Sequence, residues 1–289
     1  MSNQYGELYI VATPIGNLGD ISERARQVLT DVDLIAAEDT RHSRKLLSHY
    51  GINTRMVSYH DHNEDRAALN LLEKLSAGMN IALISDAGTP LINDPGYHLV
   101  KNAKDRGIRV IPIPGPSALV AALSASGLAT DRFVFEGFLP EKKQARINRL
   151  TAIEQEKRTL VFYEAPHRIL ALVEDCVNVL GADRTMCVAR ELSKVYETIR
   201  TDSSGEILNW LKSDKASCKG EFVVCIEGNS ASVSPQEAEL KKMLSVLMAS
   251  TGLNEAVKIA VELSGEKKNT LYSLALELKK DKEKSQSPK

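Results

Sequence analysis

Apolar runs alternate with amphipathic stretches along the first 130 residues, and this alternation predicts strands followed by helices. Most of the runs are apolar at consecutive positions, which is typical of parallel strands buried on both faces. The predicted strands are residues 8–14, 33–39, 56–60, 80–88 and 109–115. We therefore predict that residues 1–132 form an α/β domain built from a βα repeat.

Polar residues and prolines mark the expected starts of three helices. Asp20 and Glu23 have the three-residue spacing of a capping box. Asp94 precedes Pro95, and Pro116 follows a strand; proline suits the first turn of a helix, where no N–H is needed. These signals predict helices that begin directly after Asp20, after Asp94 and at Pro116.

The pattern changes around Phe133, where a second α/β unit is predicted over residues 133–228. It begins with a strand and a polar, basic helix at 142–158. The later strands lie close together in sequence with few helices between them, which indicates a mixed sheet.

A short polar linker at 229–236 leads into a predicted helical module at 236–280. Its core is expected to contain Ala256, Ile259, Ala260 and Leu263, which recur at helical spacing. The highly charged residues 281–289 are expected to be a disordered tail.

The composition is that of an ordinary globular protein, with 43% hydrophobic residues, 26% charged residues and a net charge of −1. No run reaches the roughly 18 apolar residues of a membrane span, and the start lacks the pattern of a secretory signal. The four cysteines form no CxxC pair, which favours a reducing compartment. We therefore expect a cytoplasmic protein.

A nearly neutral protein that binds RNA must gather its basic residues locally. Two segments qualify for this role, the predicted connector helix and the C-terminal module. Their basic residues are Lys142, Lys143, Arg146 and Arg149 in the first and Lys258, Lys267 and Lys268 in the second.

Several common nucleotide and hydrolase motifs are absent from the sequence: GxxxxGK[ST], a GxGxxG after the first strand, HExxH and GxSxG. Four other segments place Gly, Pro and polar residues directly after predicted strands: 14–17, 38–41, 85–90 and 115–118. Each segment taken alone could be an ordinary turn, because Gly, Pro and small polar residues are common in turns. Because ligands of open α/β sheets bind at the carboxyl ends of the strands, the four together predict a ligand site at that edge.

The order of motifs TPIGNLGD, EDTR, SDAGTPLINDPG, PGPSA, GFLP, FYEAPHR and AREL…KGEFV resembles the tetrapyrrole-methylase-like superfamily. Within it, the sequence is most similar to the branch that methylates the 2′-oxygen of a cytidine in 16S ribosomal RNA. The resemblance covers residues 5 to about 228, and the C-terminal module also resembles that branch. It implies two α/β domains with S-adenosylmethionine in the cleft between them, a homodimer, and a 16S rRNA substrate within the 30S particle.

The resemblance also implies which residues contact S-adenosylmethionine. Small residues and prolines let a backbone approach the cofactor closely, and the start of a helix offers free N–H groups. From the first domain these contacts are Pro14, Asp86, Ala87, Gly88, Ile92, Ser117 and Ala118. From the second domain they are Tyr163, Leu192, Gly220, Glu221 and Phe222.

A ribose hydroxyl is a very weak acid, so a positioned general base is expected. The candidate catalytic residues are Glu38, Asp39, Arg41 and Glu164, with His60 as a weaker candidate base. Glu38, Asp39 and Arg41 could instead cap the helix that follows them and form an ion pair.

Other polar clusters also have two interpretations. Arg190, Glu191, Lys194 and Glu197 could form an ion-pair network or the mouth of an RNA groove. His60, Asp61 and His62 are a weak metal cluster, and no metal is expected because methyl transfer from a sulfonium does not require one. The C-terminal module could bind RNA or support the fold or a dimer.

Two rival functions are weighed against the RNA methyltransferase. One is a C-methyltransferase of a corrinoid or porphyrin, for which neither a helical appendage nor a charge-rich cleft is expected. The other is a non-catalytic ribosome-assembly protein that binds RNA, against which the intact SDAG and PGPSA segments argue. Labelled methyl transfer to ribosomal RNA rather than to a tetrapyrrole separates these possibilities.

Overall fold

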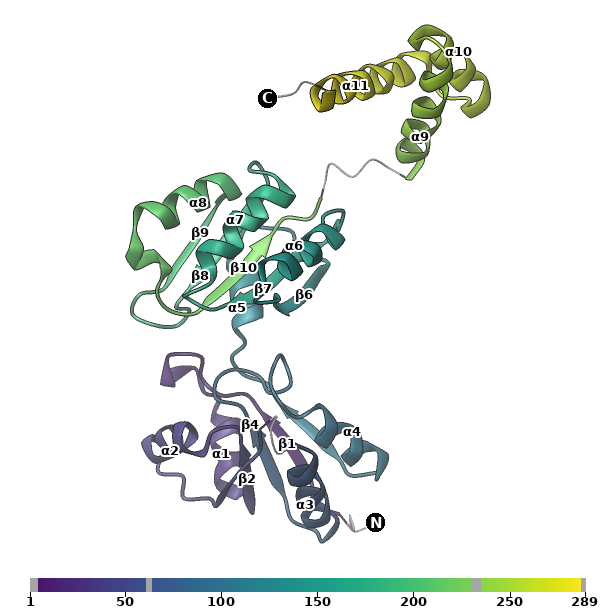
Figure 1. Ribbon diagram of the computed structural model, residues 1–289. Helices are drawn as coiled ribbons and strands as arrows, with labels where there is room; N and C mark the ends of the chain where they lie inside the picture. Colours follow the sequence, from purple (N-terminus) through teal and green to yellow (C-terminus); the bar gives the residue numbers. More distant parts are fainter. Residues whose placement is uncertain (1–4, 61–63, 230–234, 287–289) are drawn as a thin grey trace. The chain divides into compact units, whose positions relative to one another are not determined.

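The computed structural model describes residues 5–60, 64–229 and 235–286 (Figure 1). The chain divides into two compact units, Met1–Asn229 and Ser230–Lys289. The first unit contains two five-stranded sheets, and the second consists of helices. No helix of the described residues is both long enough and apolar enough to span a lipid bilayer.

The first sheet is entirely parallel, with the strand order β3-β2-β4-β1-β5. Its strands are β1 Leu8–Val11, β2 Leu34–Ala37, β3 Met56–Ser58, β4 Ile81–Ile84 and β5 Val110–Ile113. Alternate residues of each strand enter two hydrophobic clusters, so both faces of the sheet are covered. The helices that follow these strands are α1 Glu23–Asp31, α2 Thr40–His49, α3 Glu64–Ser76 and α4 Tyr97–Asp105. The predicted parallel βα architecture is confirmed.

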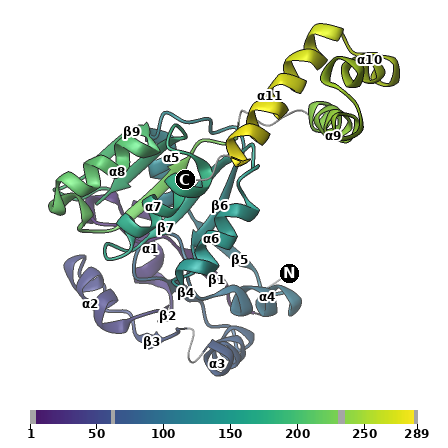
Figure 2. The ribbon, with the colours of Figure 1, turned by 45° about the horizontal axis from the view of Figure 1, so that its top comes forward.

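The second sheet is mixed, with the order β6-β7-β10-β8-β9, in which only the β6–β7 pair is parallel. Its strands are β6 Phe133–Phe138, β7 Thr159–Glu164, β8 Thr185–Arg190, β9 Thr198–Ser203 and β10 Phe222–Ile226. Helices α6 Lys143–Ala152, α7 Ile169–Leu180 and α8 Ser204–Ser213 cover one face, and α7 lies between the other two (Figure 1 and Figure 2).

Helix α5, Ala118–Ala125, covers the opposite face of this second sheet. Leu119, Ala122 and Leu123 pack there against Val161 of β7 and Val223 of β10. By its packing α5 therefore belongs with the second sheet, although it precedes residue 132, where the sequence pattern placed the domain boundary. Hydrophobic spacing shows that a helix has an apolar face and does not show which sheet covers that face.

All three predicted helix starts are wrong. Helix α5 begins at Ala118 after its N-cap Ser117, not at Pro116. Ser22, not Asp20, caps α1, and its hydroxyl accepts a hydrogen bond from the Ala25 N–H at 3.1 Å. Asp20 instead ends a short 3-10 helix, η1 Leu18–Asp20, which Asn17 caps. Helix α4 begins at Tyr97, after Gly96, so Asp94 lies outside it. A serine caps a helix as well as an aspartate does, so the local sequence alone left two possible starts.

The second unit packs α9 Pro235–Ser250, α10 Leu253–Ser264 and α11 Lys268–Gln286 around one core. Ala256 and Ala260 are buried as expected, whereas Leu263 is 66% exposed and Val257 is buried instead. Helix α11 continues to Gln286, past residue 281, where a disordered tail was predicted to begin. Lysine and glutamate favour helices, and no Gly or Pro interrupts residues 281–286.

Candidate functional site

The loops after β1 and β4 lie together at one edge of the first sheet. Thr13 N–H donates to Gly88 O at 2.8 Å, and Gly88 N–H donates to Thr13 O at 3.0 Å. Gly88 has a φ of 88°, which favours glycine, and a Cβ there would lie 3.5 Å from the Ile15 side chain. Segments 75 residues apart in sequence thereby form one rim.

The acidic residues after β2 stabilise this rim through backbone hydrogen bonds. Asp39 N–H donates to Asp86 Oδ1 at 3.1 Å, and Asp86 N–H donates to Glu38 Oε2 at 3.2 Å. Asp39 Oδ1 accepts from Arg41 N–H at 2.7 Å and caps α2. This hydrogen bond holds the pKa of Asp39 below its usual range. Helix capping, one of the two interpretations of this segment, is therefore what the structure contains.

A cavity of about 320 Å³ lies within the first unit. Nine of the cofactor contacts that the resemblance implied line it: Ala87, Gly88, Ile92, Ser117, Ala118, Tyr163, Leu192, Glu221 and Phe222. Glu164 also lines it. The other three implied cofactor contacts, Pro14, Asp86 and Gly220, do not line it. Neither do the candidate catalytic residues Glu38, Asp39 and Arg41.

Eight further residues line the cavity that the sequence did not single out as cofactor or catalytic contacts. Seven of them lie inside the motifs, so neighbouring motif residues were the available signal: Ile15, Thr89, Asp94, Phe138, Ala165, Pro166 and Val223. The eighth is Lys194, which lies two residues after the AREL motif, and the local sequence does not show that its side chain faces the cavity.

The cavity has apolar walls with a few polar groups. Tyr163 meets Phe135 and Phe138 edge to face, at centroid distances of 4.9 and 5.8 Å. Ile92, also in the cavity wall, stands between Leu91 and Asn93, whose φ angles are 72° and 68°. A positive φ is rare for leucine and more common for asparagine. At the start of α5 the hydroxyl of the N-cap residue Ser117 makes no capping hydrogen bond.

Glu164 is the most unusual polar group of the cavity. It ends β7, and its side chain is 0% exposed. Oε1 accepts from Ala165 N–H at 2.8 Å and lies 3.2 Å from Arg168 Nε, whereas Oε2 has no hydrogen-bond partner in the described part of the chain. Burial raises the pKa of Glu164, and the Ala165 N–H and the Arg168 charge oppose that rise only in part.

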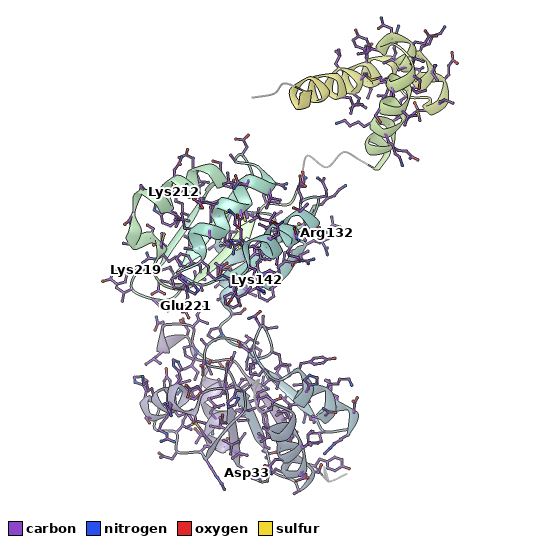
Figure 3. All side chains as sticks on the ribbon, in the orientation of Figure 1. Asp33, Arg132, Lys142, Lys212, Lys219 and Glu221 are labelled. Atoms are coloured by element: carbon purple, nitrogen blue, oxygen red, sulfur yellow. The ribbon has the colours of Figure 1, made fainter. Side chains whose placement is uncertain are left out.

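The register of the second sheet brings Glu164 to the same edge as the KGEF segment. Phe222, the first residue of β10, pairs with Glu164 of β7 on one side and with Arg190 of β8 on the other. Figure 3 labels Lys219 and Glu221 at this edge. The antiparallel pairing therefore places the end of β7 beside the start of β10, which sequence spacing cannot show.

Lys194 joins the loop after β8 to the KGEF segment. Its Nζ lies 2.8 Å from Glu191 Oε1 and 2.5 Å from Glu221 Oε2, and Glu191 Oε1 also accepts from Glu221 N–H at 3.0 Å. A Cβ on Gly16 would lie 2.4 Å from Lys194 Cγ. Of the four charged residues of this cluster, Glu191 and Lys194 form an ion pair, which Glu221 extends. Arg190 and Glu197 instead form hydrogen bonds with the backbone of Lys219 and Ser193. Lys194 is also part of the cavity wall.

Replacing Gly220 with alanine is expected to destabilise the fold by about 1–3 kcal/mol. Gly220 has a φ of 98°, and its added Cβ would lie 2.4 Å from Glu191 Cγ. Urea unfolding measures the loss. Gly181→Ala is the matched control, because Gly181 has a φ of 96° and nothing within 4 Å of an added Cβ. An equal loss in both variants would show that backbone strain, not the collision with Glu191, is responsible.

The predicted basic connector does not present all its charges to solvent. Arg146 is buried, and its Nη2 lies 2.7 Å from Asp175 Oδ2. Arg149 forms a two-point ion pair with Glu136, at 2.7 Å for each contact. Lys142 and Lys143 remain exposed, and Figure 3 labels Lys142. The expectation of a four-residue RNA-binding patch was therefore wrong for Arg146, because its partner Asp175 lies on another helix, α7.

Among the described residues no group of three or more His, Cys, Asp or Glu side chains could hold a metal ion. Asp61 and His62 of the histidine cluster lie outside those residues, and His60 is not part of the cavity lining.

Comparison with protein families gives two matches along the chain. Residues 7–208 match the family Tetrapyrrole (Corrin/Porphyrin) Methylases. Residues 234–279 match the RsmI C-terminal HTH domain. The first match covers both sheets except β10, and the second covers most of the helical unit.

Individual relatives support the same relationship. The chain is 55% identical over 275 residues to Ribosomal RNA small subunit methyltransferase I of Escherichia coli O157:H7, covering 95% of this chain and 96% of the relative. It is 52% identical over 281 residues to the protein of the same name from Haemophilus influenzae, covering 96% and 98%. A crystal structure of uroporphyrin-III C-methyltransferase from Thermus thermophilus, complexed with S-adenosyl homocysteine, has the same fold. Its TM-score is 0.53 at 17% identity, covering 78% of this chain and 98% of that one. The chain therefore belongs to the tetrapyrrole (corrin/porphyrin) methylase family.

Proposed function

We propose that this chain transfers the methyl group of S-adenosylmethionine to the 2′-oxygen of a cytidine in 16S ribosomal RNA. The observation that carries this proposal is its 55% identity, over 95% of its length, to Ribosomal RNA small subunit methyltransferase I. That similarity includes the C-terminal helical unit as well as the two sheets. The 30S particle as substrate, a homodimer and action in the cytoplasm, where ribosomes assemble, are parts of the same proposal.

The residues of the cavity fit S-adenosylmethionine. The cavity volume of about 320 Å³ is within the usual range for small-molecule sites. Ile92, Phe138 and Leu192 offer apolar surface to the adenine and to the aliphatic carbons of the methionine part. The Ser117 hydroxyl and the first N–H groups of α5 suit a carboxylate, and Asp94 supplies negative charge for the ammonium group.

When bound, S-adenosylmethionine supplies an electrophilic methyl group, so the protein must orient the acceptor oxygen and remove its proton. Among the candidate bases, Glu164 fits this task. It lines the cavity, its Oε2 has no protein partner among the described residues, and burial raises its pKa. Glu38 and Asp39 lie outside the cavity wall, and both accept backbone hydrogen bonds.

A porphyrin or corrinoid C-methyltransferase remains the alternative within this family. The porphyrin enzyme of known structure shares only 17% identity with this chain, which supports a common fold and not a common substrate. We therefore favour RNA as the substrate.

The decisive experiment incubates the full chain and methyl-labelled S-adenosylmethionine with one substrate in each reaction. The four substrates are naked 16S rRNA, 30S subunits, 70S ribosomes and uroporphyrinogen III. We expect label in 16S rRNA from 30S subunits, and nuclease mapping should find it on the ribose of one cytidine. Label in the tetrapyrrole alone would replace the proposal with the porphyrin alternative. No transfer, despite cofactor binding measured by calorimetry, would favour a non-catalytic assembly protein.

Removing the C-terminal unit is expected to leave cofactor binding intact and to weaken association with 30S subunits. The cut belongs after Asn229, because Asn229 N–H donates to Glu156 O at 2.6 Å and so forms part of the first unit. Lys258, Lys267 and Lys268 are exposed in the removed unit. The remaining association should therefore depend less steeply on salt, since fewer phosphates are neutralised.

The control for this truncation is the full chain with Lys258, Lys267 and Lys268 changed to glutamine. A matching loss of salt dependence would assign the effect to these charges. Unchanged 30S methylation by the truncated protein across a salt series would show that the unit only supports the fold.

A further inference from the structure

The Arg168 guanidinium lies near oxygen atoms of three residues, one of which is Glu164. Its Nε lies 3.2 Å from Glu164 Oε1, and its Nη2 donates to Leu139 O at 2.6 Å. Its Nη1 lies 4.0 Å from Glu141 Oε1. The Arg168 side chain is only 13% exposed, and its hydrogen bond to Leu139 O positions it independently of Glu164.

The two oxygens of Glu164 are consequently in different surroundings. Oε1 accepts from Ala165 N–H at 2.8 Å and lies 3.2 Å from Arg168 Nε, which forms an ion pair with it but no hydrogen bond. Oε2 is buried and has no hydrogen-bond partner among the described residues. A buried, unpartnered carboxylate oxygen is costly to maintain, and such atoms are concentrated at functional sites. Because Glu164 lines the cavity, Oε2 is the oxygen left for a proton donor that enters it.

Several other ionisable groups surround Glu164. Arg146 also carries positive charge, but it is paired with Asp175 at 2.7 Å, so its effect on Glu164 is partly cancelled. Arg168 is the cation with the largest effect on Glu164. The remaining ionisable groups are His167 on the same turn, Cys176 on α7, and Asp94, Tyr163, Lys194 and Glu221 on the cavity wall.

We infer that Arg168 is a positioning residue for the methyl transfer: its guanidinium forms an ion pair with Oε1 of Glu164, so that Oε2 is the oxygen that accepts the proton of the target hydroxyl. The inference rests on the proposed function. In the balanced step, the O–H bond of the ribose breaks as the new O–CH₃ bond forms. The proton passes to Glu164 Oε2, and the S–CH₃ bond electrons remain on the sulfur of the departing S-adenosylhomocysteine.

A purely structural role for Arg168 predicts a different result from a positioning role. A brace between α7 and Leu139 would, when lost, lower the rate equally at every pH. Loss of a charge that favours the ionised form of Glu164 would lower the rate most at low pH, where the base becomes protonated.

The test uses the full chain, 30S subunits and methyl-labelled S-adenosylmethionine, with single-turnover rates measured across a pH series. For Arg168→Gln we expect the rate loss at the acidic end to exceed the loss at the basic end by about tenfold. Arg168→Lys, which keeps the charge, should restore much of the acidic rate. Arg158→Gln is the matched control, because Arg158 also pairs with a glutamate, Glu156, but lies outside the cavity wall.

A second measurement does not depend on activity. Carbon-13 NMR of glutamate-labelled protein follows the Glu164 carboxyl group, identified by the signal that Glu164→Gln removes. Its titration midpoint should move to higher pH in Arg168→Gln and stay unchanged in Arg158→Gln.

An unchanged midpoint, together with an equal rate loss at all pH values, would overturn the inference and leave Arg168 as a brace. A wild-type chain that does not methylate 30S subunits would instead refute the proposed function. In that case the NMR titration would still show whether Arg168 controls Glu164.

Discussion

Replacing Glu164 with glutamine is expected to lower single-turnover methyl transfer to 30S subunits by about 10²–10⁴-fold, with cofactor affinity close to that of the wild type. The amide has nearly the shape of the carboxylate and cannot accept the proton of the ribose hydroxyl. Glu156→Gln is the control, since Glu156 pairs with Arg158 outside the cavity wall. A wild-type rate in Glu164→Gln would mean that solvent or the RNA accepts the proton.

The pH dependence of this effect follows from the raised pKa of Glu164, which burial causes. The carboxylate must be ionised to act as a base, so the wild-type rate should fall as the pH drops through this raised pKa. The rate of Glu164→Gln should lack this acid limb. A pH series of single-turnover rates for both proteins measures the difference.

Folding stability should respond in the opposite direction. The raised pKa means that the native state binds the Glu164 proton more tightly than the unfolded chain does. The resulting stabilisation is present at pH values below the unfolded pKa of about 4.3 and is lost as the pH rises through the folded pKa. Relative to wild type, Glu164→Gln should therefore become more stable with increasing pH in this window, as thermal unfolding can show.

Replacing Arg146 with alanine is expected to destabilise the protein by about 3–5 kcal/mol. The side chains of Arg146 and Asp175 are 5% and 2% exposed, and the substitution would leave the Asp175 carboxylate buried without its cation. It would also remove the hydrogen bond from Arg146 Nη1 to Glu141 O at 3.1 Å. Urea unfolding of the full chain, monitored with a probe in the first unit, measures the loss in the free energy of unfolding.

Two variants test the cause of this loss. The double substitution Arg146→Met with Asp175→Leu removes both charges and should recover most of the stability. Arg149→Ala breaks a pair that is about half exposed on the arginine side and should cost no more than about 1 kcal/mol. If Arg146→Ala kept its stability but bound 30S subunits weakly, Arg146 would belong to the RNA-binding surface after all.

The sequence determined the parts of this protein that depend on local pattern. Consecutive apolar runs separated by helical spacing specify parallel strands, and the carboxyl ends of parallel strands necessarily share one edge. For that reason the segments at 85–90 and 115–118 could be assigned to one ligand site, where Ala87, Gly88, Ser117 and Ala118 line the cavity. The resemblance carried by these motifs likewise gave the family correctly.

The tertiary structure alone decided which of several similar residues faces the cavity. Glu38 and Asp39 follow β2 and Glu164 ends β7, yet only Glu164 lines the cavity, because β7 ends beside the start of β10. Arg146 and Arg149 lie on one basic helix, yet only Arg146 is buried, since Asp175 on α7 packs against it. A charge distant in sequence changes the pKa, burial and hydrogen bonding of a side chain, and local spacing contains no information about such a partner.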